Sequence, residues 1–431
     1  MKTQTNTNSP LATAILTRAT QSRRAMKWQH LATPAAAALL LLSSASLVEA
    51  VPLAAQVVFG GAGTQQGTGV AISAGNVFFS SNNTAINDGV VGRYNGALTA
   101  LNWSQPLGFS TGNFQGVAVS NSVYVAGSSS NPALVADGVG GFEAKSIAAS
   151  VGLGGGAYNW RTQTPAGAPF LPYSGSEGSF GIAVANSGGV DSIYTTGFAQ
   201  ANGGASGYTM TLAKLNQAGG TVATTTFNTG IGTFGNAITT LGGNVFVAGL
   251  TSNSVNAVLR AYDGNLGFLW MDAGLAGNYK DVTAYNGDIY AVGVSGANGI
   301  VSRYNAITGA RLWTQTYVGD VLNGIVGDNG VLYAVGSSGT DAVLLSLDAA
   351  TGTLQNTQTF GGAGTDVFND IALNTANDTL YAIGATDSAS LGANGNDIWI
   401  AEFTTPTPEP TSAALLGLGA LLLAARSRRN A

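Results

Sequence analysis

A short apolar pattern recurs along the chain: two apolar or aromatic residues, two small residues and a closing Gly. A degenerate first copy has Ser where the Gly is expected. Alternation of large and small side chains is typical of a strand packed on both faces, so each copy predicts one β-strand. The copies follow one another at intervals of 46, 70, 52, 44, 43 and 48 residues and occupy residues 77–81, 123–127, 193–197, 245–249, 289–293, 332–336 and 380–384.

Three further strands accompany each copy. An alternating run such as 370–373 precedes it, and an apolar run such as 342–347 follows it. A turn such as 348–352 then leads to a last strand, for which 311–315 is an example. Four strands per unit and a period in the forties predict an all-β, seven-bladed β-propeller.

The two ends of this body predict how the ring closes. The seventh unit stops after its third strand, 398–403, whereas the first segment, 56–61, is a lone strand. The residues Phe-Gly-Gly-Ala-Gly-Thr at 59–64 recur identically at 360–365, where they follow a fourth strand. The N-terminal strand is therefore expected to complete the last blade and hide two sheet edges. The predicted propeller spans 56–404, with an inserted loop near 141–178 that explains the interval of 70.

Residues 1–50 read as an N-terminal extension and signal peptide. Lys27 precedes an apolar core that runs to Ala50, after which cleavage is expected. Translation from Met1 and from Met26 both fit this pattern. Arg23 and Arg24 resemble part of a twin-arginine signal, but ordinary secretory export fits the segment better.

Residues 405–431 form a tail with three parts. A Pro-Glu-Pro box precedes the apolar segment 413–425, and a basic cluster follows it. At 13 residues the segment is short against the roughly 20 that usually cross a bilayer. The basic cluster nevertheless favours a membrane span, because positive charge stays on the cytoplasmic side. The residues that carry this pattern are Pro408, Glu409, Pro410, Arg426, Arg428 and Arg429.

This tail resembles the PEP-CTERM sorting signal of Gram-negative bacterial surface proteins. The resemblance implies processing by signal peptidase and an exosortase-like enzyme, with transient anchoring in the inner membrane. It implies a final place at the cell envelope, the cell surface or the extracellular matrix. The body resembles the "beta-propeller repeat" class of secreted bacterial proteins, through Gly361-Gly362-Ala363-Gly364-Thr365-Asp366 followed by Tyr381-Ala382-Ile383-Gly384.

Charge and residue content narrow the function. Between residues 51 and 407 there are eight basic and nineteen acidic residues, so the exported body carries about −11. Such a surface repels nucleic acid, which is not expected as a partner. The lone histidine, His30, lies in the signal region, and the chain has no cysteine. Nucleophilic systems built on His or Cys and ordinary zinc sites are therefore excluded.

No catalytic residue follows from these patterns, and the prediction is a non-enzymatic surface or matrix protein whose propeller binds glycan or protein. Extracellular polysaccharide is the expected ligand class. The alternative is a carbohydrate-active enzyme, a lyase or glycosidase, that uses carboxylates alone.

Two sets of residues are candidates for binding. The first set lies in the inserted loop, where aromatic side chains are expected to stack on sugar rings or, alternatively, to cover a local apolar patch. It consists of Tyr158, Trp160, Arg161, Phe170 and Tyr173. The second set consists of carboxylates near the start of the first strand in three blades. They are expected to converge on Ca²⁺ or, alternatively, to cap turns. These residues are Asp281, Asp320, Asp366 and Asp370. No other cofactor is expected. The remaining tryptophans near strands are predicted to pack in the body, namely Trp103, Trp270, Trp313 and Trp399.

Overall fold

The computed structural model describes most of the predicted body. Its described residues are 50–60, 63–84, 88–106, 108, 112–129, 145–155, 157–163, 177–200, 207–229, 232–251 and 255–405. All of them belong to one compact unit, residues 48–431. The signal region and the sorting tail, with its predicted span 413–425, lie outside these residues. Within the described part, no helix is both long and apolar enough to cross a membrane.

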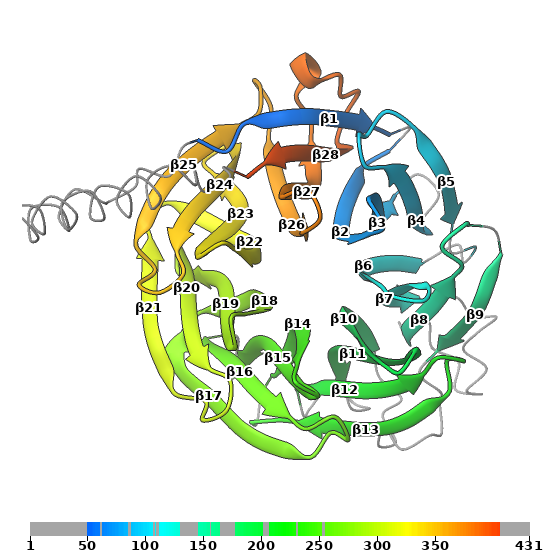
Figure 1. Ribbon diagram of the computed structural model, residues 1–431, viewed down its shortest axis with the longest axis vertical. Helices are drawn as coiled ribbons and strands as arrows, with labels where there is room; N and C mark the ends of the chain where they lie inside the picture. The colour runs from blue at the N-terminus through cyan, green and yellow to red at the C-terminus, as the bar shows by residue number, and fades with distance from the viewer. Residues whose placement is uncertain are drawn as a thin grey trace, which may run out of the picture. The chain divides into compact units, whose positions relative to one another are not determined.

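The strands form seven four-stranded antiparallel sheets arranged around one axis (Figure 1). In each sheet the first strand lies nearest the axis and the fourth lies at the rim. Blade 1 is β2 (Gln65–Ser73), β3 (Asn76–Asn83), β4 (Asp88–Asn95) and β5 (Leu101–Pro106). Blade 2 is β6 (Gly112–Val119), β7 (Val123–Ser129), β8 (Lys145–Val151) and β9 (Tyr158–Gln163). Blade 3 is β10 (Glu177–Ser187), β11 (Val190–Gln200), β12 (Tyr208–Asn216) and β13 (Thr221–Phe227).

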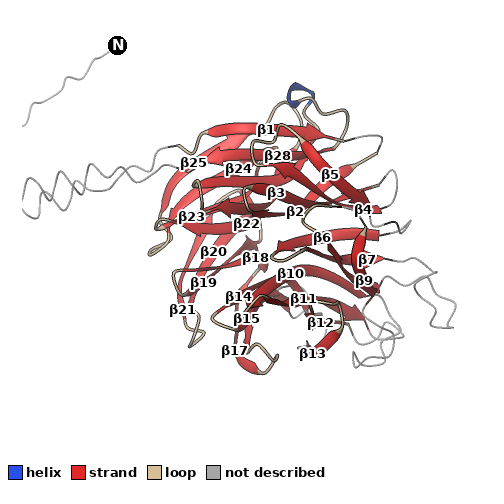
Figure 2. Ribbon diagram, turned by 45° about the vertical axis from the view of Figure 1, so that its right-hand side comes forward, coloured by secondary structure: helices blue, strands red, loops and turns tan. Residues whose placement is uncertain are grey.

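The remaining blades repeat this order. Blade 4 is β14 (Phe234–Leu241), β15 (Asn244–Thr251), β16 (Asn256–Tyr262) and β17 (Phe268–Ala276). Blade 5 is β18 (Asn278–Tyr285), β19 (Asp288–Ser295), β20 (Asn298–Asn305) and β21 (Arg311–Tyr317). Blade 6 is β22 (Asp320–Asp328), β23 (Val331–Ser338), β24 (Asp341–Asp348) and β25 (Leu354–Phe360). Blade 7 is β26 (Asp366–Asn374), β27 (Thr379–Thr386), β28 (Asp397–Thr404) and β1 (Leu53–Phe59). A short 3-10 helix, η1 (Ala389–Leu391), lies between β27 and β28, and the rest of the described chain is strand and loop (Figure 2).

Blade 7 closes the ring as predicted. The N-terminal strand β1 pairs antiparallel with β28, so that Val58 lies opposite Trp399. The Trp399 indole Nε1 donates a hydrogen bond to Gln56 Oε1 at 3.0 Å across this pair. The seven-bladed architecture and its closure by the first strand are therefore confirmed.

The recurring apolar motif forms the second strand of every blade, and its aromatic residue reaches the next blade. The hydroxyl groups of Tyr194, Tyr290 and Tyr381 donate to turn carbonyls of the following blade at 3.0, 3.1 and 2.6 Å. Tyr124 donates to the buried Asp191 carboxylate of the following blade at 2.7 Å. The repeat thus contains a hydrogen bond between blades as well as a strand.

The apolar core is divided among the blade interfaces. The buried side chains fall into seven clusters, and each cluster draws its residues from two neighbouring blades. One cluster joins Ile383 and Ile400 of blade 7 to Val77 and Phe79 of blade 1. A single blade therefore has no core of its own, and its burial depends on both neighbours.

At the rim, tryptophans of one blade pack on glycines of the next. The glycines end the turn between the third and fourth strands and have positive φ, a conformation that costs Gly little. A Cβ at any of them would lie within 3 Å of the indole ring, so only Gly leaves room for it. The four pairs are Trp103 with Gly155, Trp160 with Gly219, Trp270 with Gly309 and Trp313 with Gly352.

At two of the three interfaces whose rim lacks a tryptophan, a leucine occupies the turn. Leu98 and Leu266 hold the same turn position in blades 1 and 4, with φ of 54° and 69°. Both side chains are buried against the preceding blade, whose outer strand has no Trp. A left-handed backbone is unusual for Leu, so burial of the side chain offsets this conformational cost.

One boundary prediction needs correction. Residues 141–178 contain two regular strands, β8 and β9, which complete blade 2, rather than one inserted loop. The extra length instead falls between β7 and β8 and between β9 and β10, at positions outside the described residues. The small side chains of β8 and the Gly-rich turn after it conceal the strand pattern in the sequence.

Substitutions at the rim test whether a tryptophan of one blade and a leucine in the turn of the next fill the same space. Trp270→Ala is expected to lower the free energy of unfolding by about 3–5 kcal/mol, because it leaves a cavity. Gly309→Leu alone should also destabilise, since Trp270 occupies the space. The double variant should recover part of the loss, because Leu266 fills the same space in blade 4. Urea unfolding of the four proteins measures the coupling, and strict additivity would contradict this account.

Candidate functional site

All seven innermost strands carry a β-bulge at the same position. In each pairing with the second strand one residue is left without a partner. Such bulges redirect side chains, and here they direct seven toward the axis. In blade order the bulged residues are Thr68, Gln115, Phe180, Asn236, Lys280, Asn323 and Asn369, and all of them line one cavity. We call this set the axial ring.

Four members of the axial ring fasten one blade to the next. Thr68 Oγ1 donates to the carbonyl of Phe114 at 2.9 Å. The Nδ2 groups of Asn236, Asn323 and Asn369 donate to the carbonyls of Tyr279, Phe368 and Gly67 at 2.7, 3.0 and 2.8 Å. Each acceptor is the residue before the bulge in the following blade. Each of these side chains therefore uses a donor within the ring, although an amide nitrogen has two N–H groups and one bond does not exhaust it.

Two carboxylates follow bulged residues in blades 5 and 7. Asp281 accepts from the amide groups of Val282 and Ile325 at 2.7 and 2.9 Å. Asp370 likewise accepts from the amide groups of Ile371 and Val70, both at 2.8 Å. Each carboxylate thus joins its own inner strand to that of the next blade. The other five blades have Gly or Ala at this position.

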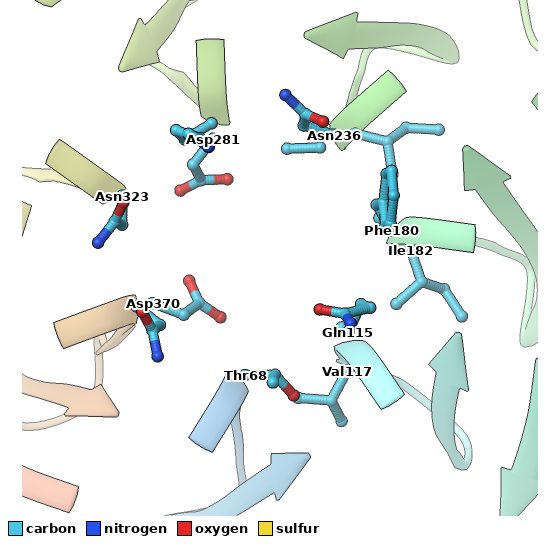
Figure 3. A pocket seen from close by; sticks show the side chains of 15 residues that line it. Thr68, Gln115, Val117, Phe180, Ile182, Asn236, Asp281, Asn323 and Asp370 are labelled. Carbon is cyan, nitrogen blue, oxygen red and sulfur yellow. The ribbon is translucent and has the colours of Figure 1, made fainter. Parts of the chain in front are cut away.

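The two carboxylates face one another beside Asn323 (Figure 3). Burial raises the pKa of Asp281 to about 6, although the two amide donors act in the opposite direction. Burial raises the pKa of Asp370 well above its usual range, and the negative charge of Asp281 adds to this. The two groups therefore titrate as an interacting pair.

The axial ring and these carboxylates enclose a cavity of about 120 Å³. Its acidic side is formed by Asp281 and Asp370 with the amide of Asn323, and Phe180 and Ile182 line the opposite side (Figure 3). Lys280 supplies the one cationic side chain among the lining residues. The cavity is smaller than the roughly 300 Å³ at which pockets for drug-sized ligands begin, so it has room for one small polar group.

Of the four carboxylates considered for calcium, the structure brings two together. Asp281 and Asp370 line the cavity, whereas Asp320 and Asp366 do not. Asp366 is buried and accepts from Ser388 Oγ at 2.8 Å and from the amide of Gly362 at 2.9 Å, so it holds the loop before β26. This contact matches the turn-capping alternative. Among the described residues, no group of three or more acidic, His or Cys side chains is placed to hold a metal ion.

The aromatic candidates of blade 2 lie on a strand. Tyr158, Trp160 and Arg161 belong to β9, and Phe170 and Tyr173 lie outside the described residues. The Trp160 indole Nε1 donates to the carbonyl of Gln217 at 2.9 Å, as part of its packing on blade 3. The Arg161 guanidinium lies over the Tyr158 ring, 5.2 Å from its centroid. A role for these residues in glycan binding stays a prediction. The tryptophans predicted to pack do so.

Sequence reasoning missed the axial ring, although a signal for it exists. In every unit a triplet precedes the aromatic motif: the bulged residue, then Gly, Ala or Asp, then Val or Ile. Three of the seven triplets begin with Asn, at positions 236, 323 and 369. The triplet is short, and its meaning depends on a bulge that alternation alone does not predict.

Comparison with known proteins identifies the fold alone. No protein-family model matches the chain, and no curated protein matches it. The structure of U3-55K is similar with a TM-score of 0.57 and 11% identity, over 82% of this chain and 99% of that one. The RRP9 WD40 repeats match with a TM-score of 0.57 and 10% identity, over 83% and 99%. The Neurospora crassa Pan2 WD40 domain matches with a TM-score of 0.53 and 9% identity, over 83% and 95%. The body is therefore a seven-bladed propeller of WD40-like fold.

The carboxylate pair should make stability depend on pH. An unfolded Asp titrates near 3.9 and folded Asp281 at about 6, so folding takes up a proton between these values. The free energy of unfolding should therefore fall by about 1–2 kcal/mol as the pH rises from 4.5 to 7. Because Asp281 is partly exposed, this change is smaller than the full value of about 1.4 kcal/mol per pKa unit. Asp281→Asn should reduce the slope of the profile measured by urea unfolding without abolishing it, because burial still raises the pKa of Asp370. An unchanged slope in Asp281→Asn would disprove this assignment.

Proposed function

We propose that the axial cavity binds a neutral, hydroxyl-rich group, the terminal sugar of a glycan. The observation that carries this proposal is the balance of hydrogen-bonding groups around the axial ring. Thr68, Asn236, Asn323 and Asn369 each use a donor on a neighbouring blade, and the carboxylates of Asp281 and Asp370 add acceptor oxygens. The Gln115 amide and Lys280 supply donors to the same lining, and a ligand rich in hydroxyl groups, which both donate and accept, complements this mixture.

The shape and charge of the cavity support the same ligand class. A sugar ring has hydroxyl groups at its edge and C–H groups on its faces. The carboxylate side of the cavity suits the first, and Phe180 with Ile182 suits the second (Figure 3). A charge of about −11 on the exported body disfavours anionic ligands. The small volume favours the end of a glycan chain over an internal segment.

The cellular setting of this function comes from the sequence. We propose that the protein is exported, anchored for a time by its tail and placed at the cell envelope or in the extracellular matrix. Support comes from the secretory segment that ends at Ala50 and from the Pro-Glu-Pro box at 408–410 with its basic cluster. A rigid propeller that binds glycan ends would fasten to matrix polysaccharide without any reaction.

A second candidate is a glycosidase or lyase that uses carboxylates alone. The facing pair of Asp281 and Asp370 favours it, because paired acids with separated pKa values serve as acid and base. Against it, each of the four carboxylate oxygens already accepts a backbone amide hydrogen bond. Such fixed contacts suit a structural role better than proton transfer, so binding remains the preferred function.

Gln115 allows a test of the binding site without loss of the fold. Among the described residues it is the ring amide that makes no hydrogen bond to the next blade. Gln115→Ala should weaken retention on an immobilised neutral polysaccharide at least several-fold, because one contact to the sugar is lost. Gln105→Ala, at a half-buried glutamine on β5 that does not line the cavity, is the matched control. Equal retention of both variants would refute cavity binding, and new reducing ends in the same incubation would favour the enzyme.

Processing is tested on secreted material by intact mass. Cleavage near the Pro-Glu-Pro box should remove the apolar segment and the terminal arginines. The expected mature protein then begins after Ala50 and lacks Arg428. A mass that retains Arg428 would mean that the tail is not cleaved. Replacement of Glu409 by Ala is expected to leave uncleaved protein in the membrane fraction.

A further inference from the structure

Among the described residues, the outer strand of blade 4 exposes more large apolar side chains than any other outer strand. Strand β17 has nine residues, whereas the other outer strands have six or seven. It ends its sheet, so its outer edge pairs with no other described strand. Phe268, Leu269 and Met271 are 55%, 45% and 41% exposed. Three large apolar side chains within four residues form an exposed strip that packing inside the blade does not explain.

A cation lies beside this strip without a carboxylate. The Arg260 guanidinium carbon is 3.9 Å from the ring centroid of Phe227 and 4.4 Å from that of Phe268, so aromatic rings flank it. Its Nε is buried and has no hydrogen-bond partner, and one Nη lies 4.0 Å from the sulfur of Met271. Burial lowers the pKa of Arg260, an effect that Tyr262 partly offsets.

Two other arginines of the body form ion pairs with carboxylates, whereas Arg260 forms none with the described residues. Arg303 pairs with Asp288 at 2.6 Å, and Arg311 pairs with Asp272 at 3.3 Å. Among the described residues no carboxylate forms an ion pair with Arg260, although the body has more than twice as many acids as bases. The flanking rings cover the faces of the guanidinium plane, so a carboxylate would approach its edge beside Tyr262, which already interacts with Arg260.

We propose that the outer edge of β17 binds an extended polypeptide segment that carries one acidic side chain between apolar ones. Backbone amide and carbonyl groups along Trp270–Asp272 pair with the main chain of the segment, as in strand addition at other sheet edges. The apolar side chains of the segment cover Phe268 and Met271, and its carboxylate binds Arg260. This site lies at the rim and is independent of the axial cavity.

A polypeptide fits these features better than a glycan does. A sheet edge presents donors and acceptors at the regular spacing of a main chain, which a sugar polymer does not match. Blade 5 provides a contrast: β21 exposes Leu312 by 48%, but its arginine is already paired. The bulged position of the outer strand, Leu269 in blade 4 and Leu312 in blade 5, therefore offers a matched pair for mutation.

The test uses the exported body and a fluorescein-labelled nine-residue peptide. In this peptide Val and Thr alternate, beginning with Val, and Glu replaces the central Val, so that it lies on the same face as the other valines. Fluorescence anisotropy should show saturable binding, at least tenfold weaker for the same peptide with Lys at its centre. Leu269→Asp should weaken binding at least tenfold, because it places a negative charge beside the carboxylate without touching the core. Leu312→Asp should leave binding unchanged.

Arg260 itself is tested by two substitutions. Arg260→Ala should abolish the preference for Glu over Lys, and Arg260→Lys should retain part of it. Absence of saturable binding, or equal binding of the two peptides by the unaltered protein, would overturn the proposal. An equal loss in Leu269→Asp and Leu312→Asp would do the same. Concentration-dependent dimers that Leu269→Asp dissociates would assign the edge to a second copy of the chain and also overturn it.

Discussion

The pairing of β1 with β28 is the contact on which every other feature of the fold depends. It joins residues 339 to 350 positions apart and converts seven sheets into a closed ring. Because each apolar cluster is shared by two blades, an open ring would expose two cluster halves at once. Closure also removes the free edge of β28, which would otherwise pair with other chains. The chain achieves this without cysteine, so hydrogen bonds and burial alone hold the ring shut.

At six of the seven interfaces between blades, the same space at the rim is filled in one of two ways that exclude each other. Either a rim tryptophan packs on a glycine of the next turn, or a leucine from that turn packs on a rim without tryptophan. Nearer the axis, motif tyrosines and ring amides add directed hydrogen bonds. Apolar filling at the rim fixes the spacing of the blades, and polar contacts at the axis fix their angle. The rim tryptophans, motif tyrosines and ring amides extend from each blade to its successor, whereas Leu98 and Leu266 extend to the preceding blade.

The sequence predicts this architecture because its strands are encoded locally. Alternation and a closing Gly identify the second strand of each blade, and the repeated Phe-Gly-Gly-Ala-Gly-Thr segment identifies the closing strand. The axial ring escapes such reasoning because a bulge reverses the alternation at one residue. The choice between a rim pair such as Trp270 with Gly309 and a buried turn leucine such as Leu266 escapes it as well. In each case the two sides of the contact belong to different repeats. Strand β8 escapes such reasoning because its side chains are small, and their burial depends on the neighbouring blades.

The chemistry of the axial cavity follows from the way in which the ring is held together. In this propeller, Asn and Thr side chains that line the cavity join the inner strands by donating to the next blade. Where Asp replaces Gly, the carboxylate performs the same joining task by accepting amide protons instead. Both solutions place oxygen atoms beside a channel whose lining also contains the Gln115 amide and the Lys280 ammonium group. The proposed preference for a hydroxyl-rich ligand would thus arise from the contacts that join the blades, and a change in ligand class would require different contacts between them.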